Sequence, residues 1–254
     1  MLQRTIFIPT YTDVDLAAQT TYSYSVVAFD HAGNDSATSA TIEVRTGAPP
    51  ATFVQVNAAT PQSPQSTVSA TYSGAQGAGH TNIVAVGWND TTANLTGVSD
   101  TAGNSYRLAI ATVRGNGLSQ AIYYAANIRG SATGTNRVTA RFDRTAIFVD
   151  LRIVEYAGLR ATNPFEAGVS RTGVGSLASS GLLTTSTTGA LLFAAGMTGT
   201  TYSGAGAGFT VRIVTTPDGD LIEDAIGGAP GAHGAIAPLT SGAWLLQLAA
   251  FGAN

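Results

Sequence analysis

The feature that most constrains the fold is an alternation of polar and apolar residues with a period of two, repeated in short stretches along the chain. The stretches "TYSYSVV" (21–27) and "NRVTARFD" (136–143) are examples. Successive side chains of a β-strand point to opposite faces, so this period predicts strands with one wet face. Clusters of Gly, Asn and Asp separate the stretches, and β-branched residues are frequent within them. We therefore expect an all-β protein with almost no helix.

Composition excludes several classes of partner and site. Only 11% of the 254 residues are charged, the net charge is −3, and all 12 basic residues are arginine. A nucleic-acid partner normally requires a basic surface, so we expect none. The sequence has no stretch of the roughly 20 apolar residues that a membrane-spanning helix needs. It also has no cysteine, which excludes disulfides and thiolate metal sites.

A five-residue frame, Asp-x-Ala-Gly-Asn, occurs twice, as "DHAGN" at 30–34 and as "DTAGN" at 100–104. Aspartate accepts hydrogen bonds from backbone N–H groups a few residues on, glycine supplies a positive φ, and asparagine tolerates a left-handed conformation. The frame predicts two structural turns, made by Asp30, Gly33, Asn34, Asp100, Gly103 and Asn104. A calcium site would need more oxygen ligands around each glycine, and neither copy supplies them.

Residues 1–46 have the pattern of the last strands of a domain, and "GAPP" (47–50) is a linker signal. The stretch "TYTDVDLAAQTTYSYSVVAFDHAGNDS" resembles the C-terminal half of a fibronectin type III domain. That resemblance implies that Tyr22 is a corner tyrosine whose hydroxyl bonds back to the chain. The strands that would precede this half are absent from the sequence. We therefore expect exposed strands in 1–46 that could pair with a second copy.

Residues 51–254 predict one large antiparallel β-sandwich of the jelly-roll or concanavalin-like kind. The stretches "ALLFAAGM" (190–197) and "AWLLQLAAF" (243–251) are apolar on both faces, which predicts central, covered strands. The strand candidates are 53–59, 66–73, 81–89, 105–113, 118–127, 136–143, 147–157, 182–187, 190–197, 209–215 and 243–252.

The same region is similar to a bacterial extracellular module that recurs beside fibronectin type III repeats. The stretches that carry this resemblance include "VSDTAGNSYRLA", "LSQAIYYAANI" and "GAWLLQLAAFG". The resemblance implies a fold and a setting outside the cell, but no established activity. The first residues, "MLQRTIFIPTYTDVDL", lack the order of a signal peptide, so we expect an export signal upstream of this chain.

Catalytic signatures are weak. The three histidines, His31, His80 and His233, are unpaired and fall in expected loops, which does not favour a metal site. Glycosidases need two carboxylates at a set separation. Asp150 and Glu155 are five apart and would face opposite sides of a strand, as would the adjacent Glu223 and Asp224. We expect no catalytic residues, no metal and no cofactor.

Trp88 is the strongest hint of ligand contact in the sequence. It ends an apolar strand and precedes Asn89 and Asp90, and a flat aromatic face beside polar groups suits a sugar ring. The alternative is that Trp88 closes the end of the core while Asn89 and Asp90 begin a turn. The sequence thus predicts a non-catalytic extracellular adhesion or accessory module for a glycan or other surface polymer. A self-assembling, strand-pairing surface protein is the second hypothesis, and a cryptic glycoside hydrolase is the third.

Overall fold

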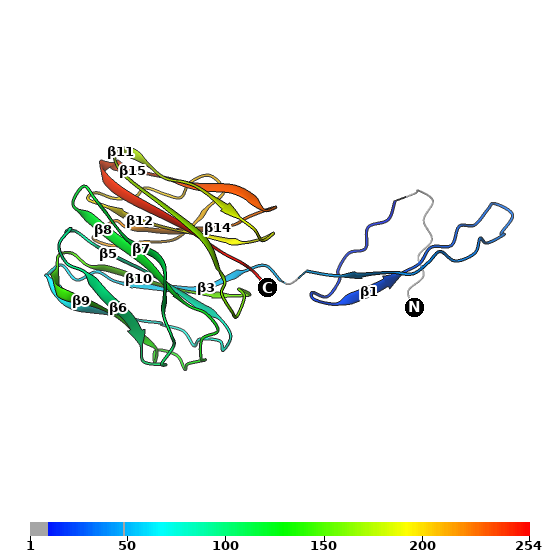
Figure 1. Ribbon diagram of the computed structural model, residues 1–254, viewed down its shortest axis with the longest axis horizontal. Helices are drawn as coiled ribbons and strands as arrows, with labels where there is room; N and C mark the ends of the chain where they lie inside the picture. Colours follow the sequence, from blue (N-terminus) through cyan, green and yellow to red (C-terminus); the bar gives the residue numbers. More distant parts are fainter. Residues whose placement is uncertain (1–9, 48) are drawn as a thin grey trace. The chain divides into compact units, whose positions relative to one another are not determined.

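The computed structural model describes residues 10–47 and 49–254, and the expectations for residues 1–9 and 48 lie outside them. These residues contain strands and loops and no helix (Figure 1), so the prediction of an all-β chain is confirmed. No described segment is a helix of the length and apolarity that a bilayer crossing requires. The chain divides into two compact units, Met1–Pro49 and Pro50–Asn254. We call them the N-terminal unit and the large unit.

The N-terminal unit contains one antiparallel pair, β1 (Thr21–Tyr24) and β2 (Ile42–Arg45). Tyr22 and Tyr24 on β1 are half-buried, while Thr21 and Ser23 between them are exposed, as the period of two predicts. The hydroxyl of Tyr22 accepts a hydrogen bond of 2.9 Å from the backbone N–H of Ala17. The hydroxyl thus bonds back to the chain just upstream of its own strand, which is the geometry of a tyrosine corner.

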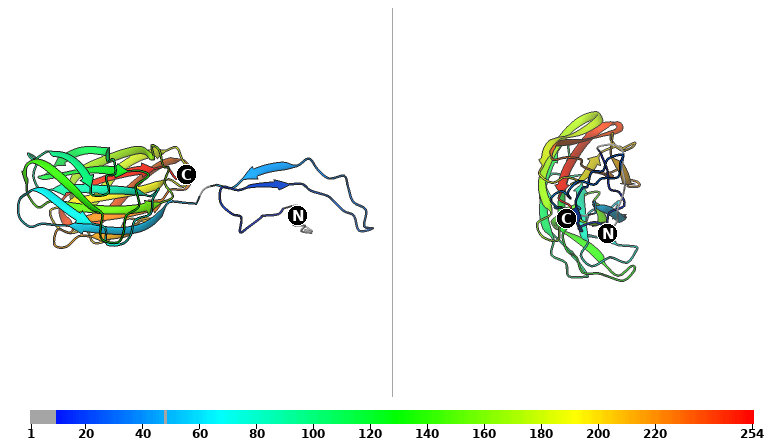
Figure 2. Two further views of the ribbon diagram at one scale, coloured as in Figure 1. Left: turned by 90° about the horizontal axis from the view of Figure 1, so that it is seen from below. Right: turned by 90° about the vertical axis from the view of Figure 1, so that its right-hand side faces the viewer.

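The large unit contains three antiparallel sheets, which lie in layers in Figures 1 and 2. The central sheet has the order β3 (Thr52–Ala59), β10 (Asp150–Ala157), β5 (Thr81–Trp88), β8 (Leu118–Ala125) and β7 (Arg107–Gly115). The β15 sheet has the order β11 (Phe165–Thr185), β15 (Gly231–Phe251), β12 (Leu191–Thr198), β14 (Leu221–Ile226) and β13 (Thr210–Val214). The small sheet has the order β4 (Gln65–Thr71), β9 (Arg137–Ala146) and β6 (Leu95–Asp100).

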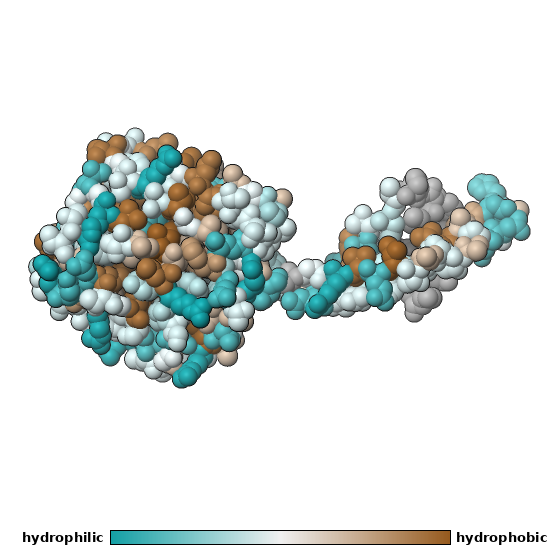
Figure 3. All heavy atoms as spheres, in the orientation of Figure 1, coloured by the Kyte–Doolittle hydropathy of each residue, from teal (hydrophilic) through white to brown (hydrophobic). Residues whose placement is uncertain are grey.

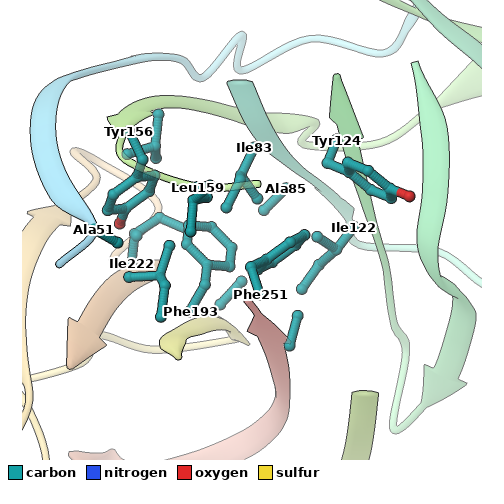
Figure 4. Close-up of a cluster of buried hydrophobic side chains, with 14 of the residues drawn as sticks. Ala51, Ile83, Ala85, Ile122, Tyr124, Tyr156, Leu159, Phe193, Ile222 and Phe251 are labelled. Atoms are coloured by element: carbon teal, nitrogen blue, oxygen red, sulfur yellow. The ribbon is translucent and has the colours of Figure 1, made fainter. Parts of the chain in front are cut away.

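The central sheet is covered on both faces, which explains why its inner strands are apolar throughout. Alternate residues of β5 belong to two different cores: Ile83 and Ala85 pack toward the β15 sheet, whereas Val84 packs toward the small sheet. Figure 4 shows the first of these cores, where Phe193 and Phe251 of the β15 sheet meet residues of the central sheet. All eight residues of β5 are buried. The predicted sandwich is therefore present, with a third layer that the sequence did not indicate.

The two longest strands, β11 and β15, pair antiparallel, and the half of this pair formed by residues 177–185 and 231–238 covers the remaining face of the β15 sheet. Phe193 on β12 points into the first core, so its neighbours Leu192 and Ala194 point to the opposite face. There they pack with residues from this half of the pair, such as Ala178 and Ala237. Register shifts near Gly175 and Gly181, which both have positive φ, interrupt the pairing of β11 with β15 between its two halves. The β15 sheet is consequently apolar on both faces.

Candidate functional site: a polar pocket at Tyr124

The expectation that Trp88 offers an exposed face to a ligand is wrong. Its side chain is completely buried, with the ring edge-on to Phe142 at 5.1 Å between centroids and the Arg114 guanidinium 5.5 Å from the ring. The physical reason is the small sheet, which covers this end of β5. Asp90 is a turn residue, because its Oδ1 accepts hydrogen bonds from the N–H groups of Thr92 and Ala93.

Asn89 is half-buried and takes part in the same turn. Its backbone N–H donates to the carbonyl of Ile147 at 2.8 Å, and the carboxylate of Asp90 accepts from the N–H of Ile147 at 3.3 Å. These bonds join the chain after β5 to the loop before β10. The residues Trp88, Asn89 and Asp90 therefore have structural roles, as the alternative interpretation of this stretch held.

The two Asp-x-Ala-Gly-Asn frames form the same turn. In each, the aspartate Oδ1 accepts from the asparagine backbone N–H at 2.9 Å, for Asp30 with Asn34 and for Asp100 with Asn104. The asparagine side-chain amide donates to the other carboxylate oxygen, at 2.8 Å in the first copy and 2.7 Å in the second. The glycines have φ of 85° and 73°. Within residues 10–47 and 49–254, no cluster of His, Asp or Glu could hold a metal ion.

His80 and Glu155 are brought together, although the sequence placed them in unrelated segments. The Nδ1 atom of His80 lies 2.6 Å from Oε1 of Glu155, whose side chain is fully buried. The same carboxylate accepts from Gln55 Nε2 at 2.6 Å and from the backbone N–H of Gly77 at 3.1 Å. These three bonds tie the loop before β5 to β10 and β3. The carboxylate is fully engaged in holding this loop against the central sheet.

The other carboxylates named from the sequence also face opposite sides of their strands. Asp150 pairs with the fully buried Arg152 on the β15-sheet side of β10, at 2.7 Å, whereas Glu155 lies on the other side. Asp224 accepts from the Tyr156 hydroxyl at 2.5 Å between the two large sheets. Its neighbour Glu223 points to the opposite face of the β15 sheet and accepts from the N–H of Gly206. No two of these carboxylates face each other across an open cleft as glycoside hydrolysis requires.

The concavity that combines an aromatic ring with hydrogen-bonding groups lies where β7 and β8 meet the loop between β10 and β11. Its volume is about 260 Å³, and it is lined by Ser105, Arg107, Tyr124, Ala126, Ala161, Thr162 and Asn163. Arg107 is the direct cross-strand partner of Tyr124. The Nη1 atom of Arg107 donates to Oδ1 of Asn163 at 2.9 Å, which fixes the loop against the strand.

Tyr124 belongs to both the core and this pocket. Its ring packs edge-on against Phe251 at 5.6 Å and stacks with Phe165 at 6.2 Å between centroids. Figure 4 shows its hydroxyl pointing away from the other labelled side chains of the core. A ring fixed by packing and a hydroxyl at the pocket surface make a rigid element for contacts with a polar ligand.

Comparisons with protein-family models, curated proteins and solved structures found no match to this chain.

Proposed function

We propose that the chain is a non-catalytic accessory or adhesion module of an extracellular or cell-surface protein, and that its large unit binds a glycan. The observation that carries this proposal is the pocket at Tyr124. It combines the rigid ring of Tyr124 with hydroxyl and amide groups of Ser105, Thr162 and Asn163. Binding sites for small ligands are concave and hold a few positioned polar groups beside apolar surface.

The size of the pocket limits the ligand to a short segment of a polymer. Sites for drug-sized ligands occupy roughly 300–1,000 Å³, whereas this pocket has about 260 Å³. One sugar residue of a chain, with its neighbours over the surface outside, suits this volume. In Figure 3 the visible face of the large unit shows hydrophobic residues interspersed with hydrophilic ones and not one continuous apolar surface. A polysaccharide that keeps most of its hydroxyls in water is compatible with such a surface.

Substitution of Asn163 tests the proposal without disturbing the backbone. Asn163 has a positive φ of 46°, so Asn163→Gly removes the amide and leaves the loop conformation accessible. We expect this variant to lose retardation in affinity gels that contain the polysaccharide bound by the unchanged protein. The matched control is Asn116→Gly, because Asn116 also has a positive φ, of 54°, and lies in the turn at the other end of the β7–β8 hairpin.

If Asn163→Gly still binds the polysaccharide, or if Asn116→Gly loses as much binding as Asn163→Gly does, the pocket at Tyr124 is not the binding site. Binding of no polysaccharide in a panel of neutral and acidic polymers would remove the proposal itself.

A second candidate function is assembly through the N-terminal unit. Val26, Ile42 and Val44 in this unit are 68%, 60% and 50% exposed. A two-stranded pair also presents the backbone N–H and C=O groups of its edges, which can pair with another chain by strand addition. We propose a second copy of the same chain as that partner, and concentration-dependent light scattering as the first test.

A further inference from the structure

We propose that the pocket at Tyr124 selects a sugar residue that carries a carboxylate, and that Arg107 is the residue that binds this carboxylate. The inference rests on the proposed glycan-binding function and names the class of glycan. Arg107 is the one charged residue among the seven that line the pocket. A negatively charged group of the ligand would therefore meet a positive partner there and no carboxylate of the pocket wall.

The guanidinium of Arg107 has donors left for a ligand. Arginine carries five N–H donors in a planar fork that matches the two oxygens of a carboxylate. Within residues 10–47 and 49–254, the side chain of Arg107 makes one hydrogen bond, from Nη1 to Asn163 Oδ1. This bond holds the guanidinium at the pocket and leaves the rest of the fork for a bidentate contact.

The nearest arginine along the loop is already occupied. Arg160 forms an ion pair with Glu166 and donates a hydrogen bond to the hydroxyl of Thr187. Glu166, in turn, accepts the backbone N–H of Ser186 at 3.0 Å. The negative charge closest in sequence to the loop is thus neutralised by Arg160, which leaves the positive charge of Arg107 unopposed at the pocket.

Neutral groups complete the arrangement that a uronic acid residue requires. The hydroxyls of Ser105, Thr162 and Tyr124 donate and accept hydrogen bonds, as sugar hydroxyls do. Asn163 uses its Oδ1 for Arg107, which leaves its Nδ2 amide as a donor for a ligand. A neutral sugar would satisfy these groups but would leave the guanidinium without its best partner.

The experiment compares acidic polysaccharides with the same polymers after methyl esterification, which removes the charge and keeps the sugar. Polygalacturonate, alginate and hyaluronate are titrated into the full chain by calorimetry, with dextran and xylan as neutral polymers. We expect at least one acidic polymer to bind at least about tenfold more tightly than its methyl ester, because hydrogen bonds to charged groups are the strong ones. Arg107→Gln should remove this preference, so that the acidic polymer and its methyl ester bind the variant with about equal affinity.

The matched control is Arg137→Gln, which removes the same charge from an exposed position at the start of β9, outside the pocket. It should bind as the unchanged protein does. Equal binding of acid and ester, or full binding by Arg107→Gln, would overturn the inference while the glycan function stands. Binding of dextran or xylan alone would also overturn the inference and leave the proposed glycan-binding function standing. If none of the polymers binds, both the inference and the proposed function fail.

Discussion

Glu223 lies in an environment that disfavours its ionised form. Its carboxyl is fully buried on the face of β14 that residues 177–185 and 231–238 cover, where Oε2 accepts the backbone N–H of Gly206 at 2.8 Å. The other oxygen, Oε1, has no hydrogen-bond partner in the described part of the chain. Burial raises the pKa of this carboxyl from its ordinary value of 4.5 to about 7, although the bond from Gly206 works in the opposite direction.

Stability should therefore fall as the pH rises from 4.5 to 7. In this range the folded protein holds a proton that the unfolded chain has released, so the free energy of unfolding decreases with pH, by on the order of 3 kcal/mol in total. Glu223→Gln keeps an acceptor for Gly206 and cannot ionise. Urea unfolding at pH 5 and pH 8 should show a smaller loss of stability between the two values for Glu223→Gln than for the unchanged protein.

Glu43→Gln, on the exposed strand β2, is the control for the removal of one carboxyl. If Glu223→Gln changes the free energy of unfolding by the same amount at pH 5 and at pH 8, the carboxyl does not titrate in this range.

At the residue scale, the sequence predicted the hydrogen-bonding roles of the turn residues better than it predicted which side chains are buried. The run "IVAVGW" (83–88) is apolar at consecutive positions, the same signal that predicts covered strands at 190–197 and 243–251, and it favours the alternative in which Trp88 closes the end of the core. The pocket at Tyr124 could not be predicted from the sequence, because its position depends on the register of β7 with β8. The turn pairs Gly115 with Leu118, and an unbroken hairpin from there would put Ala109 opposite Tyr124, but two register shifts put Arg107 there. Bulges of this kind leave little trace in one sequence.

At the scale of elements, the Asp-x-Ala-Gly-Asn sequence forms the same turn in both units. In the second copy the Oδ2 atom of Asp100 also accepts from the hydroxyl of Tyr106 at 3.2 Å and from Nδ2 of Asn136 at 3.1 Å. The turn after β6 is thus fixed to the start of β9 as well as to itself. Among the residues that the structure describes, the first copy has only its internal bonds around Asp30, and it is exposed throughout.

Gly103→Val should destabilise the large unit by roughly 1–3 kcal/mol, because a branched residue is strained at a positive φ. The control is Gly97→Val on the neighbouring strand β6, where φ is ordinary and a new Cβ meets no atom within 4 Å. Gly33→Val should cost a similar amount but act only on the N-terminal unit. Urea unfolding measures the effect of Gly103→Val, and hydrogen exchange at the turn measures that of Gly33→Val.

The unchanged protein should have the same melting temperature in the presence of calcium as in the presence of a chelator. A rise of several degrees on addition of calcium would show that one of these turns holds an ion and would contradict their purely structural role.

Strands with alternating or continuous apolar residues were predicted well. The pattern identified β5, β8 and β12 to within two residues at each end. Most of β11 was missed because "EAGVSRTGVGSLASS" is rich in small residues, which resemble a loop in a single sequence. β14 was missed because Glu223 and Asp224 stand in its middle, and charged residues are rare inside buried strands. In both β11 and β14, pairing with neighbouring strands outweighs the structural preference of the local sequence.

At the scale of the whole molecule, the two units differ in how much apolar surface they bury. β5 and β12 of the large unit are buried at every residue, whereas β2 of the N-terminal unit is exposed at every residue. A two-stranded pair is at best marginally stable in water on its own. The N-terminal unit therefore has little buried apolar surface to stabilise it, whereas the large unit has much.

Hydrogen exchange should separate the two units. In dilute solution we expect fast exchange of the amides of Thr21–Tyr24 and slow exchange of those of β5 and β12, because local opening costs least where little apolar surface is buried. Protection of Thr21–Tyr24 that grows with protein concentration would support pairing between two copies. Strong protection of these amides at every dilution would contradict the marginal stability of the N-terminal unit.

The place of β15 has a consequence for the order in which the chain can fold. The strand lies between β11 and β12, so that Phe251 pairs with Phe165 on one side and with Leu191 on the other. Contacts between residues so far apart in sequence require large loops to close, and proteins rich in them reach the native state slowly. Until residues 242–251 have been synthesised, β11 and β12 have no common neighbour and their apolar faces stay in water. Loss of residues 242–251 would therefore separate β11 from β12, whereas the loss of a strand at the edge of the sheet only narrows it.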